Sequence, residues 1–337
     1  MTRKLILAYL LILVAAVSAW AQYGTEVAPQ REVVIYEGDA AGGSIPLLLS
    51  GWGSGRAEEV SAHSYIGPRV LRIMTQGYYA GARLDFRRAI SLTDYIGKPN
   101  AYIRMALKPA LAPPAKRGTL TQPGQPGYVR PGGSRGSRGD RRDEDEYEPT
   151  YGPTVGPTPA ETSTPSEPEF RAETLRLVLA TDQGPYEIRD VSIEKDNKDE
   201  RGWIKLAAPL ALFKGASGQN AQRLVIFADR PDMFYVGEVR LSLVPVTPIS
   251  LQVKVDPVET QPGKQVKFTA TASAGLAPLE IVWDFDSADG LQEDAKGKEV
   301  VNIYQKVGEY TATCLVKDLT GGNQPFKRTM GVRIVAR

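Results

Sequence analysis

The amino-acid sequence predicts an all-β protein that consists of two sandwich domains in succession. Short runs in which apolar and polar residues alternate recur along most of the chain, which is typical of half-buried strands. The chain also holds 33 glycines and 25 prolines, which favour turns and interrupt helices. Cys314 is the only cysteine, so no intramolecular disulfide can form and apolar cores must stabilise the fold.

The N-terminus is predicted to be a secretory signal peptide over residues 1–21. A short basic start precedes an apolar run over 5–17 that is too short to span a bilayer comfortably. Ala19 and Ala21 are the small residues that a signal peptidase reads, and cleavage would leave a chain that begins at Gln22. We therefore expect a secreted protein of the periplasm, the extracellular space or the cell surface, with no membrane span after signal cleavage.

The first domain is predicted over residues 31–246, and a long polar insert interrupts it. Residues 112–169 are rich in proline, glycine and charged residues, so they bury too little apolar area to offset their ordering entropy and are predicted to be disordered. Neither flank holds enough strands to close a sandwich alone. A single domain with a long loop is the prediction, because loop-closure entropy grows only slowly with loop length. Two small domains joined by a linker are the alternative.

Five segments of the first domain follow one another in a characteristic order. They are VVIYEGDAAGG, SGWGSG, YIGPRVLRIMTQGYYAGARLDF, GWIKLAAPLALF and FYVGEVRLSLV. This order resembles that of the galactose-binding-like jelly rolls that serve as carbohydrate-binding modules. The resemblance implies an antiparallel β-sandwich with Trp203 in its core and carbohydrate as the ligand.

The same resemblance implies where a structural calcium ion would be held. Many of these modules bind calcium through acidic residues near both ends of the fold, and Glu37, Asp39 and Glu238 stand at or near such places. Gly237 departs from the pattern, because the family often has aspartate there. We expect no cofactor, and a structural calcium ion is the alternative.

Aromatic residues of the first domain are candidates for stacking on sugar rings, whose C–H faces pack against flat apolar groups. Trp52, Tyr65, Tyr78 and Tyr79 are the main candidates. Adjacent strand residues face opposite ways, so one of the two neighbouring tyrosines must point outward. The alternative is that these rings only pack against edges and loops.

Arginines alternate with apolar residues in four strand-like runs of the first domain. If these strands share one sheet, their arginines lie together on its polar face. An acidic polysaccharide is then a natural partner, since guanidinium groups pair with carboxylate or sulfate. The alternative is a solvated face whose arginines pair with Asp85 and its neighbours. The four residues are Arg72, Arg83, Arg104 and Arg176.

The pattern changes at residues 249–337, where short strands and tight turns predict a second sandwich of immunoglobulin-like size. In IVWDFDSADG, residues 281–290, strand parity predicts that Trp283 faces the core and Asp284 the outer face. This stretch and YQKVGEYTATCLVKD resemble the PKD domain, whose signature is Trp-Asp-Phe-Gly-Asp-Gly. The resemblance implies a tyrosine corner at Tyr310 and aspartates that hold turns. Parity also predicts that Cys314 is a buried thiol.

Neither domain shows a local motif for catalysis, and a glycosidase whose two carboxylates lie far apart in the chain is the open alternative. The chain has one histidine, His63, and no histidine, cysteine and acid cluster with metal-ligand spacing. With 41 basic and 39 acidic side chains, the balance gives no argument for nucleic acid as a partner. We expect a non-catalytic exported protein that binds a polysaccharide or glycan, acidic polysaccharide included, through the jelly roll, with the PKD domain as spacer or protein-contact module. The alternative is a structural or adhesive cell-surface scaffold that contacts another surface protein and has no sugar affinity.

Overall fold

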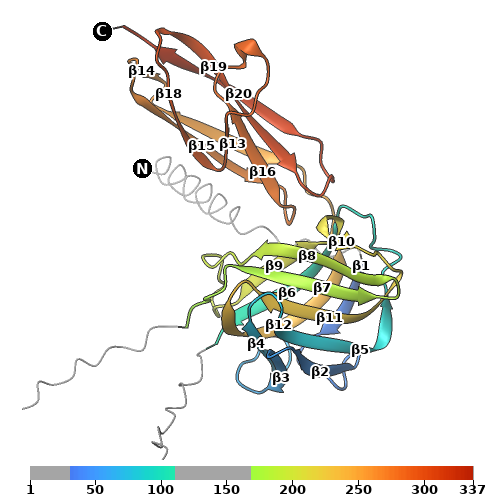
Figure 1. Ribbon diagram of the computed structural model, residues 1–337. Helices are drawn as coiled ribbons and strands as arrows, with labels where there is room; N and C mark the ends of the chain where they lie inside the picture. The colour runs from blue at the N-terminus through green and yellow to red at the C-terminus, as the bar shows by residue number, and fades with distance from the viewer. Residues whose placement is uncertain (1–30, 111–167, 337) are drawn as a thin grey trace, which may run out of the picture. The chain divides into compact units, whose positions relative to one another are not determined.

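The computed structural model describes residues 31–110 and 168–336 (Figure 1). These residues form strands joined by turns, with two short 3-10 turns, η1 (Leu210–Leu212) and η2 (Ser287–Asp289), so the all-β prediction is confirmed. None of the helical segments in this part of the chain is long and apolar enough to span a membrane. The predicted signal peptide over 1–21 and nearly all of the predicted insert over 112–169 lie outside the described residues.

One sheet of the jelly roll, here sheet A, contains six antiparallel strands. Its order is β3-β4-β12-β6-β9, and β1 pairs with β12 on the side where β4 also pairs. Register shifts mark irregularities in β1 and in β12, where one strand gains a residue over its neighbour. The strands are β1 (Arg31–Tyr36), β3 (Arg56–Val60), β4 (Val70–Gln76), β6 (Ala101–Pro109), β9 (Ile204–Pro209) and β12 (Pro231–Leu243).

The second sheet, sheet B, also contains six antiparallel strands, in the order β10-β8-β7-β11-β5-β2. In both sheets strands from before the insert pair with strands from after it: β5 pairs with β11, and β6 pairs with β9 and β12. Residues on both sides of the insert therefore build one sandwich. The strands are β2 (Leu47–Trp52), β5 (Gly81–Ser91), β7 (Thr174–Thr181), β8 (Gly184–Ser192), β10 (Lys214–Gly215) and β11 (Asn220–Ala228).

Every second residue of the jelly-roll strands points inward, and these residues build the core. Leu71 and Ile73 of β4, Leu84 of β5 and Leu224 of β11 are all fully buried in one cluster. The residues between them, such as Arg72, point away from this core and reach the surface. The period of two that predicted the strands is therefore also the period that fills the sandwich.

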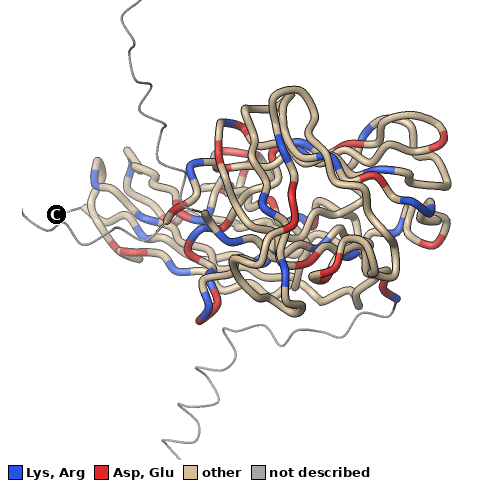
Figure 2. The backbone as a smooth tube through the Cα atoms, turned by 90° about the horizontal axis from the view of Figure 1, so that it is seen from below, with Lys and Arg blue, Asp and Glu red and all other residues tan. Residues whose placement is uncertain are grey.

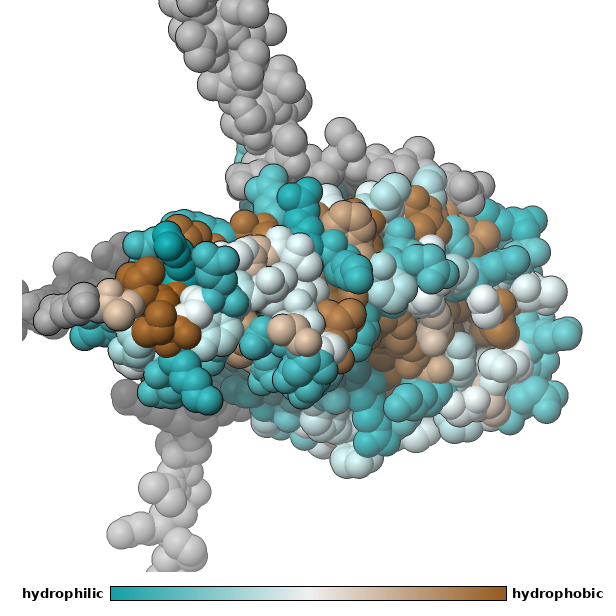
Figure 3. Space-filling view, turned by 90° about the horizontal axis from the view of Figure 1, so that it is seen from above, coloured by the Kyte–Doolittle hydropathy of each residue, from teal (hydrophilic) through white to brown (hydrophobic). Residues whose placement is uncertain are grey.

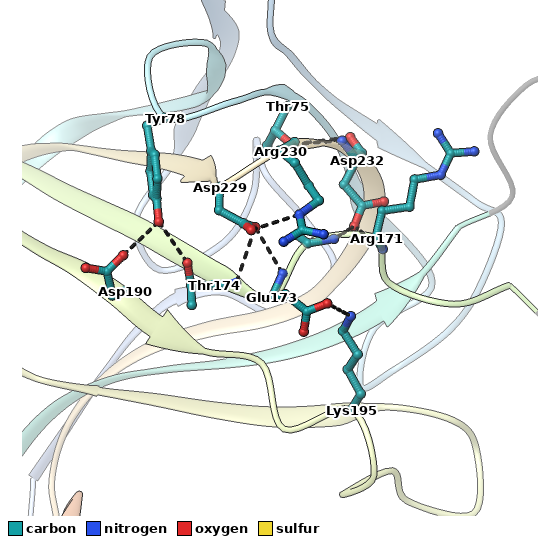
Figure 4. Close-up of polar contacts among 11 residues, drawn as sticks. Thr75, Tyr78, Arg171, Glu173, Thr174, Asp190, Lys195, Asp229, Arg230 and Asp232 are labelled. Carbon is teal, nitrogen blue, oxygen red and sulfur yellow. Dashed lines mark hydrogen bonds and ion pairs between the residues drawn. The ribbon is translucent and has the colours of Figure 1, made fainter.

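The chain that follows the insert is held against the turn between β11 and β12 (Figure 4). The Asp229 carboxylate accepts hydrogen bonds from the amides of Glu173 and Thr174, at 3.0 and 3.3 Å. The Asp232 carboxylate accepts from the amides of residues 171 and 172, both at 2.9 Å. On the other flank, the amide of Ala110 donates to the carbonyl of Met233. Both described flanks of the insert thus end at the same turn.

The C-terminal domain is a sandwich of two further sheets. Sheet C has the order β13-β15-β18, and sheet D has the order β14-β20-β19-β16-β17. Its core packs the rings of Phe268, Trp283 and Phe285, with centroids 5.5 Å apart for the first pair and 5.0 Å for Phe268 and Phe285. The strands are β13 (Ser250–Asp256), β14 (Glu259–Thr260), β15 (Gln265–Ser273), β16 (Leu279–Asp284), β17 (Ala295–Lys296), β18 (Glu299–Ile303), β19 (Gly308–Asp318) and β20 (Phe326–Ile334).

The aspartates after Trp283 hold turns, as the sequence predicts. The Asp284 carboxylate accepts from the amides of Asp286 at 2.9 Å and Gln292 at 3.0 Å, and that of Asp294 accepts from the amide of Phe285. The expectation that Asp284 lies on an open outer face is wrong, because its residue is only 3% exposed. Strand parity places a side chain on one face but does not show that the following turn folds back to cover it.

Two further predictions for this domain are confirmed. The Tyr310 hydroxyl donates to the carbonyl of Lys306 at 3.0 Å, which is the contact of a tyrosine corner. Cys314 is fully buried, and burial raises the pKa of its thiol to about 11. The thiol therefore stays protonated near neutral pH, as expected for an unreactive core cysteine.

Candidate functional site

The arginines that alternate with apolar residues are divided between the two sheets of the jelly roll. Arg72 on β4 and Arg104 on β6 belong to sheet A, whereas Arg83 on β5 and Arg176 on β7 belong to sheet B. The prediction that these four arginines share one face is therefore wrong. Alternation within each strand did place them away from the core, but the sequence does not show which sheet a strand joins.

On sheet A, the two predicted arginines are paired with acidic residues of neighbouring strands. Arg72 donates to the Glu58 carboxylate directly opposite on β3, from Nε at 2.9 Å and from Nη2 at 2.6 Å. The Arg104 guanidinium lies 3.6 Å from the Glu32 carboxylate on β1. Both predicted arginines of this sheet thus lie beside a carboxylate.

Arg240 occupies the centre of an acidic group on the same face. Its Nε donates to Glu238 at 2.7 Å, its Nη1 to Glu32 at 2.5 Å, and its Nη2 to Glu37 at 3.1 Å. The arginine side chain is 16% exposed and that of Glu238 is 9% exposed. The guanidinium thus supplies the positive charge that these carboxylates need in a partly buried place.

The residues suggested as calcium ligands do not form one ligand set. Glu37 and Glu238 both bind the Arg240 guanidinium. Asp39 instead accepts from the amides of Ala41 and Gly42, as well as from an arginine. Within the described ranges no group of three histidine, cysteine or acidic side chains is arranged to hold a metal ion. The arrangement of these residues does not fit a calcium ion.

Gly237 is the place where the jelly-roll resemblance implied an aspartate, and the structure explains the departure. A Cβ atom at Gly237 would lie 2.4 Å from Cβ of Tyr65 and 3.0 Å from the Trp203 ring. The Tyr65 and Trp203 rings pack with centroids 4.9 Å apart, and Arg201 donates to the Tyr65 carbonyl. Tyr65 therefore covers Gly237 and packs against Trp203 on the outer face of sheet A. Trp203 is buried as predicted, but in a small cluster on this outer side with Val70 and Ala106.

The outer face of sheet B carries exposed apolar side chains instead. Leu48 is 53% exposed, Trp52 is 43% exposed and Tyr79 is 72% exposed. Ile66 and Val246 are the other large hydrophobic residues that are exposed in the described part of residues 31–246. In the view of Figure 3, apolar residues reach the surface in small areas among hydrophilic ones. Leu48, Trp52 and Tyr79 thus gather on one face.

The two neighbouring tyrosines have different surroundings. The Tyr78 hydroxyl contacts Asp190 at 2.7 Å and the Thr174 hydroxyl at 3.0 Å (Figure 4). Tyr79 remains exposed, with its ring 5.4 Å from the Arg176 guanidinium. Both tyrosines lie in the turn between β4 and β5, so the difference in their surroundings comes from the turn and not from strand alternation. Tyr79 is available for stacking, and Tyr78 fixes the turn.

Arg176 holds this turn on sheet B. Its Nη1 donates to the Tyr78 carbonyl at 2.8 Å, and its guanidinium lies 4.9 Å from the Phe227 ring centroid. Its other nitrogens donate to Glu187, and its side chain is only 13% exposed. We therefore assign Arg176 a positioning role: it places Tyr79 over the sheet.

Four arginines of sheet B share two carboxylates. In what we call the Asp85 cluster, Arg83 donates to Asp85 at 2.6 and 3.2 Å, and Arg223 donates to the same carboxylate. The Glu187 cluster consists of Glu187, Arg176 and Arg189, whose Nε donates at 3.0 Å. Each cluster has two guanidinium groups that contact one carboxylate, and the nearby Asp190 carboxylate also acts on Arg189. Basic and acidic residues lie next to one another along the backbone in Figure 2.

Both cluster carboxylates are held in the ionised form. Burial acts to raise the pKa of Asp85, but hydrogen bonds from Arg83 and Arg223 lower that pKa below its usual value. Burial likewise acts to raise the pKa of Glu187, and hydrogen bonds from its two arginines lower it. Near neutral pH each carboxylate is therefore a full negative charge that two guanidinium groups share.

Sequence reasoning missed Arg189 and Arg223. Their side chains are 55% and 28% exposed, against 34% for Arg83, so all three are open to a ligand. The signal was present, because alternation in YEIRDVSI and RLVIFAD places both arginines opposite the buried residues of β8 and β11. Applying the same parity to every strand would have found them.

Comparison with known proteins identifies the C-terminal domain. The family model of the PKD domain matches residues 251–334, and this part of the chain is a PKD domain. The solved PKD1 domain of Vibrio anguillarum Epp is 18% identical, and the match covers 27% of this chain and 100% of that one, with a TM-score of 0.21. A search of curated proteins found no match.

Two further solved structures are similar over longer stretches. The C-terminal family 22 carbohydrate-binding module of Clostridium thermocellum Xyn10B is 10% identical, with 65% of this chain and 96% of that one covered and a TM-score of 0.30. The glycoside hydrolase domain of Endo-D from Streptococcus pneumoniae R6 is 10% identical, with 86% of this chain and 38% of that one covered and a TM-score of 0.27. Likeness at these scores indicates neither a shared ligand nor a shared activity.

Proposed function

We propose that this protein is a non-catalytic binding protein whose jelly roll binds acidic polysaccharide on the outer face of sheet B. The observation that carries the proposal is the coincidence of exposed Trp52 and Tyr79 with two arginine clusters on a single face. The PKD domain serves as a spacer or as a protein contact.

Each component of this face suits a part of an acidic sugar polymer. Aromatic rings pack against the C–H faces of sugar rings, and the rings of Trp52 and Tyr79 are open to solvent. A guanidinium group binds a carboxylate or sulfate through two parallel hydrogen bonds. Arg83, Arg189 and Arg223 are partly exposed and outnumber the carboxylates that they contact. A neutral sugar would leave this excess charge unused.

The location that goes with this function is outside the cytoplasm, in the periplasm or at the cell surface. The basic start, the apolar run over 5–17 and the small residues that follow support export through a cleaved signal peptide. The buried thiol of Cys314 needs no disulfide partner in an oxidising compartment.

A structural or adhesive scaffold without sugar affinity is the second candidate. It is favoured by the fact that every arginine of the two clusters already contacts a carboxylate. Ion-paired surface arginines are common on solvated faces that bind nothing. Such a scaffold would use its exposed residues to contact another surface protein.

The proposal is tested by binding of the purified protein to acidic and neutral polysaccharides at low and high salt. Polygalacturonate and alginate are the acidic probes, and xylan and dextran are the neutral ones. We expect retention on the acidic polymers that weakens as salt screens the charges. Arg83→Gln should weaken retention, whereas Arg72→Gln on sheet A is the matched control with a similarly exposed, ion-paired arginine. Equal retention at both salt concentrations, or none, would contradict the proposal.

A further inference from the structure

The two arginine clusters lie at opposite ends of one row of paired residues. Across sheet B, Glu187 pairs with Val178, Val178 with Val225, and Val225 with Arg83. Paired residues of neighbouring antiparallel strands point to the same face. With strands about 4.8 Å apart, three steps place the backbone of Glu187 roughly 14 Å from that of Arg83.

Along the strands the two clusters are separated by a shorter distance. Asp85 pairs with Arg223, Arg223 with Ala180, and Ala180 with Pro185, which lies two residues from Glu187. Two residues of strand span roughly 7 Å, so the two cluster carboxylates lie mainly across the sheet from each other. Their separation exceeds the size of a single acid group.

Uncharged residues fill the space between the clusters. Val178 and Val225 are 8% and 4% exposed, and together with Phe227 they form a small apolar cluster on this face. Each guanidinium is held at its own end by its own carboxylate, Asp85 or Glu187. The positive charge of the face is therefore concentrated in two places rather than spread evenly.

Each cluster also has an exposed aromatic ring close by. The Tyr79 ring lies 5.4 Å from the Arg176 guanidinium of the Glu187 cluster. Trp52 pairs with Gly81, two residues from Arg83 on the same strand, and such diagonal neighbours lie about 7–8 Å apart. The face thus consists of two similar halves, each with an aromatic ring and at least one exposed arginine.

We infer that the two halves act together on one ligand: an internal stretch of an acidic polysaccharide that carries acid groups on separate sugar rings. This inference rests on the proposed function and names the length and charge spacing of its ligand. One half alone contacts one acid group and binds weakly. Once a chain reaches the second half, that contact becomes intramolecular, and affinity rises through the high effective concentration of the tethered group.

The test is calorimetric titration of the purified protein with oligogalacturonates, from the monomer to the hexamer. We expect weak or unmeasurable binding of the shortest chains, then a rise of at least tenfold over one or two added rings, and little change beyond. Neutral xylo-oligosaccharides of the same lengths should show no such step. A longer chain offers more positions at which a single half can bind, and a gradual rise in affinity of only that size would overturn the inference. Equal affinity for monomer and hexamer would overturn it too.

Single-cluster variants show whether the step comes from both halves. Arg223→Gln should reduce the affinity of the hexamer to that of short chains, and Arg189→Gln should do the same from the other end. Arg72→Gln, on sheet A, should leave the step in place. A step that persists in both sheet B variants overturns the inference. Binding of polygalacturonate without a step would leave the proposed function standing, whereas no binding to any acidic polymer would remove both.

Discussion

The outer faces of sheets A and B both carry rows of arginines, yet they differ in charge balance and in cover. On sheet A, Arg72, Arg104 and Arg240 contact four glutamates, and Tyr65 covers Gly237. On sheet B, four arginines share Asp85 and Glu187, and two aromatic rings stay exposed. Arginine content therefore does not identify a binding face. A binding face is identified instead by its ratio of guanidinium groups to carboxylates and by the access of solvent to them.

The largest expected effect separates a structural arginine from a binding one. Arg240→Met should lower the free energy of unfolding by about 3 kcal/mol, because it leaves Glu238 and Glu32 without their shared partner in a partly buried place. Arg223→Met on sheet B should lower it by less than about 1 kcal/mol, since its side chain is more exposed. Urea unfolding measures both, and equal losses would contradict the difference between the faces.

The cover of sheet A is tested at Gly237. Gly237→Asp should destabilise the protein by about 2 kcal/mol, because the new side chain has no room beside Tyr65 and Trp203. Adding Tyr65→Ala should recover part of this loss. Gly331→Ala is the control, since a Cβ atom there meets nothing within 4 Å. Thermal unfolding provides the readout, and an unchanged melting temperature for Gly237→Asp would show that Tyr65 does not fill this place.

The aromatic rings of sheet B should affect binding but not stability. Trp52→Ala and Tyr79→Ala are each expected to weaken binding of polygalacturonate about fivefold, which corresponds to about 1 kcal/mol of stacking. Both rings are largely exposed, so melting temperatures should hardly change. Leu48→Ala is the control for an exposed apolar residue of the same face without an aromatic ring. Titration calorimetry distinguishes them, and an equal loss for Leu48→Ala would assign binding to general apolar contact.

A smaller effect is expected from acid. The folded-state pKa values of Asp85 and Glu187 are lowered, so these carboxylates stabilise the fold above their unfolded pKa values of about 4. That contribution is lost as the pH falls through the lower folded-state values. Asp85→Asn should therefore make the free energy of unfolding less dependent on pH between about 4 and 2. An unchanged slope in a urea titration series would show that this carboxylate is not held by its arginines.

Chelation should have no effect on sheet A. Because the Arg240 guanidinium bridges Glu32, Glu37 and Glu238, we expect EDTA to leave the melting temperature unchanged. Calcium added after chelation should not raise it either. A calcium-dependent rise would mean that an ion is bound where the sequence first suggested one.

Period-two patterns made much of this structure predictable. They predicted the strands and the burial of Trp283 and Cys314, and they placed Arg72 and Arg83 away from the core. They did not assign these two arginines to different sheets, because sheet membership depends on pairing between residues far apart in the chain.

The rest of the site depends on such long-range contacts. Arg240 on β12 meets Glu32 of β1, which lies 208 positions away in the chain. Tyr65 fills the space above Gly237 from a loop that carries no strand pattern. Arg176 binds the carbonyl of Tyr78, which lies 98 positions away in the chain, and thereby fixes the neighbouring Tyr79. No local window of sequence contains both members of any of these pairs.

The turn that holds both flanks of the insert has a consequence for how the chain can be divided. Asp229 and Asp232 hold the returning segment, and Met233 receives the departing one, so contacts of the folded domain fix both flanks. Two polypeptides, one ending at residue 110 and one starting at residue 168, carry every strand of the described jelly roll between them. The protein is therefore a natural candidate for fragment complementation, in which two separate pieces reassemble on mixing.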